Sequence, residues 1–508
     1  MTTTKKMKRR RFLKSSLITG AVGAIQNIAL IDEARAQQKP VEADFKLVNG
    51  LTQKVAEFAV NKRFEEIPDN VNELAKKSIL DGIGLAIFGA TQDTGAIISK
   101  YTVGYEQVKP VTTVIGGHKL PSRFAAFANG VAIHVSDYDD TQLAVGKDRV
   151  YGLLTHPTVP VFPVALAVGE LNDGDGRELL LAYQVGVEVE SKLAEAISPR
   201  HYEDGFHTTG TCGVFGGAIA ASKLRKFGVE ATIRAMGIAG SQAAGLRENF
   251  GTMMKPFHAG HAAEVGVVSA DLAALGWTAT DNILESPRGF FHAYGGSYDP
   301  AVILGRLGNP WTFADPGVSI KPFPSGSLTH PAMGAVMKLI KEHNVRAADV
   351  EQVYVGTNRQ NPNALIHHDP KNALQAKFSM EFCVAILLLE RNAGLREFTD
   401  QVVNRPDVRA MIKKVSFAVD PEAESAGYDK MTSIIRIHLK DGTTLSGRAD
   451  FAKGSPSNPM SYDEVAGKFM DCCTVAGWPE SKAREIVEKV HTLEKLPYVR
   501  SLAALCSK

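Results

Sequence analysis

Apolar residues recur at helical spacing along most of the first 300 residues. In the stretch 71–88, for example, Leu80, Ile83 and Ile87 fall on one face of a helix. Glycine is frequent inside such stretches, as at Gly213 and Gly217, and each one costs about 1 kcal/mol relative to alanine. We therefore expect the helices to pack closely where these glycines lie. The predicted helices cover residues 51–60, 71–88, 122–135, 156–171, 177–197 and 209–226.

After about residue 316 the pattern changes to an alternation of apolar and polar positions. This period of two predicts strands, and Asp441-Gly442 between two of them is a typical hairpin turn. Because the strands and helices of this region do not alternate regularly, an α+β unit is favoured over a doubly wound parallel sheet. The predicted strands are 350–355, 414–419, 433–439 and 443–448, and the predicted helices are 330–343, 380–390 and 462 onward.

Together these patterns predict a mainly α protein with a smaller α+β part. We expect one large all-helical domain built from both ends of the chain, at 37–316 and 455–508, and an α+β domain inserted between them at 317–454. At 508 residues the chain is long enough for more than one domain.

The first residues carry the pattern of an export signal. Residues 8–14 read Lys-Arg-Arg-Arg-Phe-Leu-Lys, a weakly apolar run follows at 15–30, and residues 34–36 form an Ala-x-Ala cleavage site. The apolar run is too short and too polar for a membrane-spanning helix. We therefore expect a twin-arginine signal peptide at 1–36, export of the folded chain by the twin-arginine translocase, and a periplasmic mature protein.

Charge and cysteine content exclude several classes of protein. The 57 Lys and Arg residues are balanced by 55 Asp and Glu residues, so the charge does not favour nucleic-acid binding. The five cysteines are too few and too irregularly spaced for a disulfide framework or a zinc knuckle. We expect most of them to be buried thiols, and one long-range disulfide stays open.

The most informative stretch is 128–156, where an apolar, helix-like run ends in three carboxylates. Asp137, Asp139 and Asp140 lie within four residues of one another. Like charges and burial both raise a carboxyl pKa, so one of the three would carry a proton near neutral pH. The alternative is a solvated acidic turn.

Two further segments carry candidate chemistry. His207 comes just before a predicted helix whose N-terminus can bind an anion, although it also fits a capping turn. Arg247, Lys255 and His258 form a basic cluster, which would bind carboxylates if it faced the acidic stretch. His258 and His261 have metal-ligand spacing, but no carboxylate motif supports a metal.

Two loops, at 321–331 and 376–379, each run into a predicted helix and complete the candidate segments. The chain has no dinucleotide-binding glycine motif after a strand, no phosphate-binding loop and no serine nucleophile elbow. We therefore expect no cofactor and no metal, and chemistry carried by His, Lys, Asp and Thr side chains.

Four of these stretches resemble the MmgE/PrpD family. They are Ala-Asn-Gly to Asp-Tyr-Asp-Asp-Thr at 128–141, Gly-Phe-His-Thr-Thr-Gly at 205–210, Met-Met-Lys-Pro-Phe-His-Ala-Gly at 253–260 and Ile-Lys-Pro-Phe-Pro-Ser-Gly at 320–326. The family includes 2-methylcitrate dehydratase, cis-aconitate decarboxylase and an iminodisuccinate epimerase. The resemblance runs from about residue 45 to the end of the chain.

This resemblance implies a homodimer, a large helical domain, a smaller α+β lid and a metal-free pocket between the two for a small di- or tricarboxylate. By motif, five residues fall on positions similar to active-site residues of the decarboxylase, and others lie close by in the same pattern. The five are Asp137, Thr141, His156, His207 and Lys255; the neighbours are Arg247, His258, Ser325, Ser327 and His330.

The chain departs from the decarboxylase pattern in two places. Gly326 stands where the decarboxylase has a histidine shortly after Phe-Pro, and only His330 matches the second histidine of that stretch. The link between Thr141 and His156 is also longer than in the family, with an insertion that contains residues 146–149. The insertion would reshape the pocket or bind another carboxylate.

The leading hypothesis is a metal-free lyase of the dehydratase type. Removing a proton next to a carboxylate gives a dianionic enediolate, which needs concentrated positive charge from residues such as Lys255 and His258. His207 or His156 would act as base or as acid, with Asp137 setting tautomer and orientation. The alternatives are an epimerase or isomerase, a decarboxylase, and a periplasmic dicarboxylate-binding protein without activity.

Overall fold

The structure is a computed structural model that describes residues 48–102, 109, 111–142, 155–197, 200–427 and 430–507. The expected signal peptide at 1–36 and the insertion after Gln142 lie outside the described residues. Helices dominate and strands form only two small sheets, so the predicted class, mainly α with a smaller α+β part, is confirmed.

The first 300 residues form the predicted run of helices. Each of the six predicted helices is present, with both ends within two residues of the prediction. A short hairpin, β1 (Thr112–Thr113) and β2 (Lys119–Leu120), was not predicted. The helices are α2 (Leu51–Asn61), α3 (Asp69–Gly89), α4 (Asp93–Thr102), α5 (Ser122–His134), α6 (Thr158–Leu171), α7 (Gly176–Ala196), α8 (Arg200–Glu203), α9 (Thr208–Leu224), α10 (Val229–Gly240), α11 (Met254–Ala274) and α12 (Phe290–Gly295).

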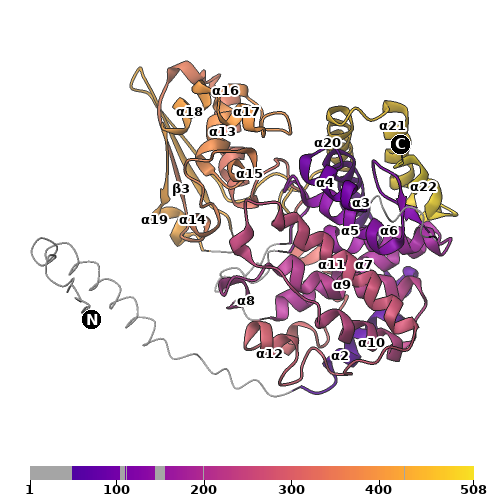
Figure 1. Ribbon diagram of the computed structural model, residues 1–508. Helices are drawn as coiled ribbons and strands as arrows, with labels where there is room; N and C mark the ends of the chain where they lie inside the picture. Colours follow the sequence, from indigo (N-terminus) through magenta and orange to yellow (C-terminus); the bar gives the residue numbers. More distant parts are fainter. Residues whose placement is uncertain are drawn as a thin grey trace, which may run out of the picture. The chain divides into compact units, whose positions relative to one another are not determined.

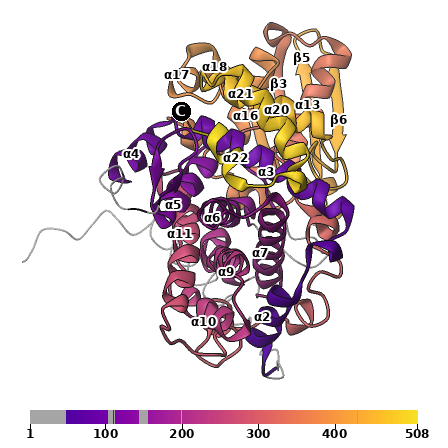
Figure 2. The ribbon, with the colours of Figure 1, turned by 90° about the vertical axis from the view of Figure 1, so that its right-hand side faces the viewer.

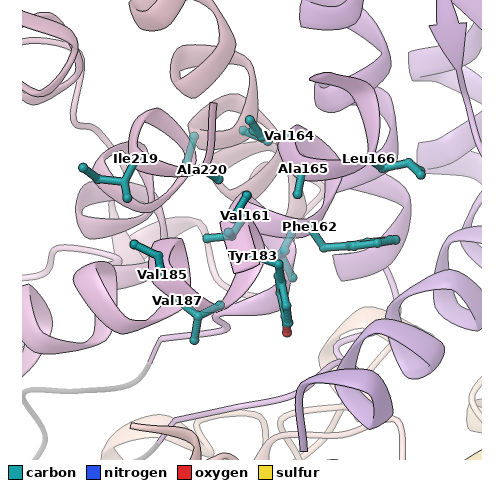
Figure 3. Packing of buried hydrophobic residues seen from close by; sticks show 14 of the residues in the cluster. Val161, Phe162, Val164, Ala165, Leu166, Tyr183, Val185, Val187, Ile219 and Ala220 are labelled. Atoms are coloured by element: carbon teal, nitrogen blue, oxygen red, sulfur yellow. The ribbon is translucent and has the colours of Figure 1, made fainter. Parts of the chain in front are cut away.

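Helices α6, α7 and α9 pack against one another in the interior of this helical part. Figure 3 shows apolar side chains of all three helices meeting there, among them Val161 and Phe162 from α6, Tyr183 from α7 and Ile219 from α9. Each of these side chains is fully buried. Burial of this apolar surface is the main favourable term for the helical part.

Glycines bring α9 and α11 into direct backbone contact. A Cβ atom added to Gly266 would lie 2.6 Å from the backbone carbon of Gly217, closer than real Cβ atoms approach other heavy atoms. A Cβ on Gly213 would lie 2.7 Å from the Pro160 ring. The expectation that helical glycines mark close packing is therefore confirmed at these positions.

The α+β part holds a four-stranded sheet in the order β4-β3-β5-β6. The β3 and β4 strands are parallel, the other pairs are antiparallel, and β5 and β6 form the predicted hairpin, with Gly442 at a φ of 88°. Helix α13 packs on β5 and β6 (Figure 2), and α16 packs on β4. The elements are β3 (Val350–Thr357), β4 (Val415–Val419), β5 (Ser433–Leu439), β6 (Thr444–Ala449), α13 (His330–His343), α14 (Gln360–Ala364), α15 (Ala373–Ala376), α16 (Met380–Glu390), α17 (Asp400–Val403), α18 (Pro406–Ile412) and α19 (Pro421–Ser425).

The last helices return to the first ones. Helices α20 (Tyr462–Val475) and α21 (Glu480–His491) contact α3, and α22 (Val499–Leu505) contacts α6. Figures 1 and 2 show the yellow C-terminal helices beside the indigo α3. One apolar cluster accordingly contains residues from both ends of the chain, and a second runs from Leu328 to Ile437. Since residues 47–508 form one compact unit, the domain bounds 37–316, 317–454 and 455–508 stay a prediction.

The cysteines were expected to be mostly buried thiols, and no membrane-spanning helix was expected. All five cysteines are buried free thiols, as expected for most of them. Among the described residues, no helix has the length and apolarity needed to cross a membrane.

Gly266→Ala tests the close contact of α9 and α11. Because the added methyl group meets backbone rather than a movable side chain, we expect a loss of about 2 to 3 kcal/mol in unfolding free energy. The matched control is Gly334→Ala in α13, where nothing lies within 4 Å of the added Cβ, so helix propensity makes it neutral or stabilising by up to about 1 kcal/mol. Urea unfolding of both variants measures the difference, and equal effects would contradict the packing argument.

Candidate active site

The candidate site is built on the loop at 135–142, which follows α5. Asp137 has a φ of 50°, a left-handed conformation that aspartate tolerates better than most residues. The chain turns sharply there, and the three carboxylates of the stretch reach three different sets of partners. All three are buried, so the alternative of a solvated acidic turn is wrong.

Asp137 pairs with two lysines. Its carboxylate lies 2.5 Å from the Lys255 ammonium and 3.1 Å from the Lys321 ammonium, and Lys321 also donates to the Asp137 backbone carbonyl at 2.8 Å. Burial alone raises the pKa of Asp137, but the two ammonium groups outweigh it and lower the pKa below its ordinary range. Asp137 is therefore a permanent anion that neutralises buried cations.

Asp139 lies between two histidines. Its carboxylate is 2.9 Å from Nδ1 of His134 and 2.9 Å from Nδ1 of His156. The pKa of Asp139 is raised by burial and lowered by these two rings, and the net direction is strongly downward. Burial lowers the pKa of His156 and brings that of His134 to about 3, so both rings are neutral near pH 7. Asp137 was expected to set the tautomer and orientation of the histidine base. Asp139 contacts Nδ1 of His156 instead, whereas Asp137 pairs with the lysines and lies 3.8 Å from Nε2 of His156.

Asp140 turns away from the other two carboxylates. It accepts hydrogen bonds from the backbone amide of Thr158 at 3.2 Å and from the Thr158 hydroxyl at 2.5 Å. Burial raises the pKa of Asp140 to about 7. A carboxyl that titrates near neutral pH is therefore present, as the stretch predicted, but it does not belong to the pocket described below.

Lys255 occupies the first turn of α11 and points at the loop. Besides Asp137, its ammonium contacts Nε2 of His134 at 3.0 Å, and the Phe250 and Phe378 rings lie 5.3 and 5.6 Å away. Burial lowers the pKa of Lys255, and the Asp137 carboxylate opposes this. Because these contacts use two of its three N–H bonds, one donor is left for a ligand.

His207 is the residue that precedes α9, and it faces the pocket from the other side. Its Nδ1 lies 3.2 Å from Nδ1 of His258. Its Nε2 is buried and has no hydrogen-bond partner among the described residues. Burial and the Lys255 charge hold the pKa of His207 well below its ordinary range, so this ring is neutral and offers Nε2 to a ligand.

These side chains meet in one pocket. Six of the ten residues that the sequence singled out line it, and Ser327 donates a hydrogen bond to Thr141 at 3.2 Å across the two parts of the chain. The lining residues are Asp137, Thr141, His156, Tyr202, His207, Phe250, Lys255, Lys321, Gly326, Ser327, Leu328, Ala364, Leu365 and Phe378.

The other four predicted residues lie behind the pocket wall. Arg247 stacks on the Tyr202 ring at 3.7 Å, and His258 contacts His207. Ser325 shares a hydrogen bond with Thr329 at 2.8 Å, and His330 contacts the Ser325 carbonyl at 3.2 Å. These contacts fit support of the lining residues, and no direct ligand contact follows from the geometry.

Several side chains of the site had no role predicted from the sequence. Lys321 and Lys377 each stand in a loop that the sequence had marked, and Lys377 donates to the Val135 carbonyl at 3.1 Å. Burial lowers the pKa of Lys377 to about 8. His134 stands in the marked stretch 128–156, three residues before Asp137. Tyr202 and Phe250 carry no pattern that would have placed them in the pocket.

Models of two domains of one protein family match most of this chain. A model of the MmgE/PrpD N-terminal domain matches residues 53–302, and a model of the MmgE/PrpD C-terminal domain matches residues 323–494. The chain belongs to the MmgE/PrpD family.

Curated relatives carry the name cis-aconitate decarboxylase. The protein from Mus musculus is 29% identical over 473 residues, which cover 90% of this chain and 93% of the relative. The protein from Homo sapiens is 28% identical and covers 89% of this chain and 93% of the relative. That from Aspergillus terreus (strain NIH 2624 / FGSC A1156) is 26% identical and covers 91% and 97%. These relatives are lyases, the class of enzyme that the sequence predicted at the coarse level.

The departure from the decarboxylase pattern at Gly326 falls on the pocket wall. A Cβ added there would meet Leu365 at 3.4 Å and Phe378 at 3.6 Å, which are ordinary contact distances. A side chain at this position would therefore occupy part of the wall without a backbone clash. The glycine leaves that space to a ligand or to water.

The family resemblance implied no metal, and one group of donors bears on that prediction. Ligand atoms of His134, Asp137, Asp139 and His156 lie within 4.8 Å of one another. However, Asp139 accepts from both rings, and the Asp137 carboxylate lies 2.5 Å from the Lys255 ammonium. A divalent cation would have to displace that ammonium, so the donor set fits a hydrogen-bonded ion network better than a metal site.

Asp140→Asn tests the raised carboxyl pKa. The ordinary value is about 3.9 and the folded value is about 7, so the folded state holds this proton more tightly. As pH rises from about 4 to about 7, the unfolding free energy of the wild type therefore falls by up to about 1.4 kcal/mol per pH unit. The variant, which has no carboxyl at this position, does not lose this contribution. Urea unfolding at pH 5 and pH 8 measures the shift. The same pH dependence in both proteins would show that Asp140 does not titrate in this range.

Proposed function

We propose that this chain is a metal-free lyase of the dehydratase type that acts on a small hydroxy di- or tricarboxylate. The observation that carries the proposal is that two neutral histidines, His156 and His207, line the same pocket as the Lys255 and Lys321 ammonium groups. The two rings lie 6.5 Å apart between centroids, so both can reach one small substrate in the pocket.

His156 fits the base. Its Nδ1 faces the Asp139 carboxylate at 2.9 Å and the Asp140 carbonyl at 3.0 Å. Both partners are acceptors, so Nδ1 carries the ring proton and Nε2 keeps a free lone pair. In the proposed step, Nε2 takes the proton next to a substrate carboxylate, and the electron pair moves onto that carboxylate as an enediolate.

The lysines stabilise this enediolate. Lys255 and Lys321 lie beside the pocket with one anionic partner, Asp137, between them. With Lys377 they place three ammonium groups against two ionised carboxylates, and the excess positive charge favours a substrate with several negative charges.

His207 fits the acid that completes the elimination. In one tautomer, His258 donates its Nδ1 proton to His207, whose Nε2 then carries a proton toward the pocket. That proton passes to the departing hydroxyl, the carbon–oxygen bond breaks, water leaves and a carbon–carbon double bond forms. His156 and His207 thus have opposite roles, His156 as the base that forms the enediolate and His207 as the acid in the elimination that follows.

Decarboxylation of cis-aconitate is the second candidate, and the names of the relatives favour it. In that reaction the lysines would hold the carboxylates that stay, and a histidine would protonate the carbon that loses carbon dioxide. The glycine at position 326 supports the dehydratase, because the decarboxylase pattern has a histidine there.

The cellular setting rests on sequence patterns. Residues 1–36 support a twin-arginine signal, and we propose export by the twin-arginine translocase and a periplasmic location. The family resemblance supports a homodimer. Gel filtration with light scattering and fractionation of the producing cells test these two points.

The decisive experiment is proton NMR of the purified mature protein in deuterium oxide with 2-methylcitrate, citrate, malate, tartrate, cis-aconitate and aspartate-derived acids. We expect vinylic signals from a hydroxy acid. Itaconate-type signals from cis-aconitate would instead establish a decarboxylase. Deuterium exchange at a stereocentre without elimination would establish an epimerase. Silence across the panel with retained binding would leave a binding protein and refute the lyase.

His156→Gln tests the base with the substrate found in that panel. We expect kcat to fall on the order of 10²- to 10⁴-fold, the usual contribution of a general base, with a small change in KM. The matched control is His261→Gln on α11, a histidine whose side chain is 36% exposed and pairs with Glu264. Equal activity of the two variants would remove His156 from the mechanism.

A further inference from the structure

The Asp139 carboxylate does not line the pocket but lies behind its wall, against His156. It is 1% exposed, and its carboxylate is 2.9 Å from Nδ1 of both His134 and His156. The two rings lie 4.4 Å apart between centroids, packed edge to face. A single side chain thus contacts the same nitrogen on two neighbouring rings.

The chemistry of the carboxylate fixes how those protons are placed. An ionised carboxylate only accepts hydrogen bonds, so both Nδ1 atoms are donors and both Nε2 atoms carry lone pairs. Nε2 of His134 then accepts from the Lys255 ammonium at 3.0 Å. Nε2 of His156 belongs to the pocket-lining ring. One anion therefore sets the direction of two separate hydrogen bonds beyond the rings.

We infer that Asp139 is a positioning residue that holds His156 as a base and Lys255 as a cation through the tautomers of His156 and His134. The roles of His156 and Lys255 rest on the proposed function, whereas the two tautomers are properties of the ligand-free protein. Asp139 itself touches no reacting atom.

The paired arrangement makes Asp139 sensitive to an isosteric change. An amide in its place has one acceptor and one donor side, so it can accept Nδ1–H from only one ring, and it drives the ring that faces its NH2 group toward the Nε2–H tautomer. His156 keeps the Asp140 carbonyl as a second acceptor at 3.0 Å, so the change is favoured at His134. If that ring is His156, its lone pair no longer faces the pocket. If it is His134, an N–H faces the Lys255 ammonium at 3.0 Å and displaces it.

The first test uses the wild-type protein alone. Nitrogen-15 NMR of histidine-labelled protein, assigned with His134→Gln and His156→Gln, reports the tautomer of each ring at pH 7. We expect both rings to be neutral with the proton on Nδ1. The Nε2–H tautomer in either ring would overturn the inference, whatever the enzyme catalyses.

The second test compares Asp139→Asn with Glu188→Gln, a buried carboxylate outside the site that accepts from the backbone amides of Gly308 and Thr312. In Asp139→Asn we expect one ring to change tautomer, with a fall in kcat on the order of 10²-fold or more if it is His156, or at least about a tenfold rise in KM if it is His134. Glu188→Gln keeps both tautomers and near wild-type kinetics.

The outcomes separate the two claims. Unchanged tautomers in Asp139→Asn overturn the inference even if activity falls, because the loss would then be structural. A change of tautomer in a protein whose wild type turns over no acid of the panel supports the inference and refutes the proposed function.

Discussion

The structure depends on the contacts that four buried lysines make with one short loop, 135–138. An unpaired ammonium group in a protein interior costs several kcal/mol, so each lysine fixes its own segment to this loop. The segments come from α11, from both loops that lead into α13 and α16, and from α20, and they are far apart in sequence. The contacts are Lys255 and Lys321 to the Asp137 carboxylate, Lys377 to the Val135 carbonyl and Lys468 to the Tyr138 carbonyl.

Close helix packing brings the chemistry to that loop. Helix α11 contacts both α5 and α9, and a Cβ on Gly130 of α5 would lie 2.8 Å from Cα of Gly260 on α11. At this spacing three segments converge: the last turn of α5, the residue before α9 and the first turn of α11. They place His134, His207 and Lys255 around one point. The small residues that weaken each helix alone are therefore what allows the site to form.

Local sequence patterns predicted most of the fold, whereas the contacts of each side chain in the site could be assigned only from the structure. Helical and alternating spacing located the elements because burial on one face is a local property of the sequence. The acidic stretch and the basic cluster were recognised as one site through the family resemblance. Which carboxylate serves which partner was not predictable, because the left-handed turn at Asp137 sends three successive acids in different directions. Lys321 and Lys377 are long-range partners of that turn, and no spacing rule connects residues so far apart.

The two apolar clusters meet at the site through polar contacts. Tyr138 donates to the Pro322 carbonyl at 3.0 Å, and Ser327 donates to Thr141 at 3.2 Å, whereas each cluster is closed on its own apolar residues. Hydrogen bonds of this kind contribute about 1 kcal/mol each, far less than the buried helix contacts. The buried ion pair of Lys321 with Asp137 crosses the same junction, and a polyanion bound by Lys321 from one side and Lys255 from the other would add further charge-assisted contacts there. A carboxylate substrate would thus strengthen the junction between the two clusters at the pocket itself.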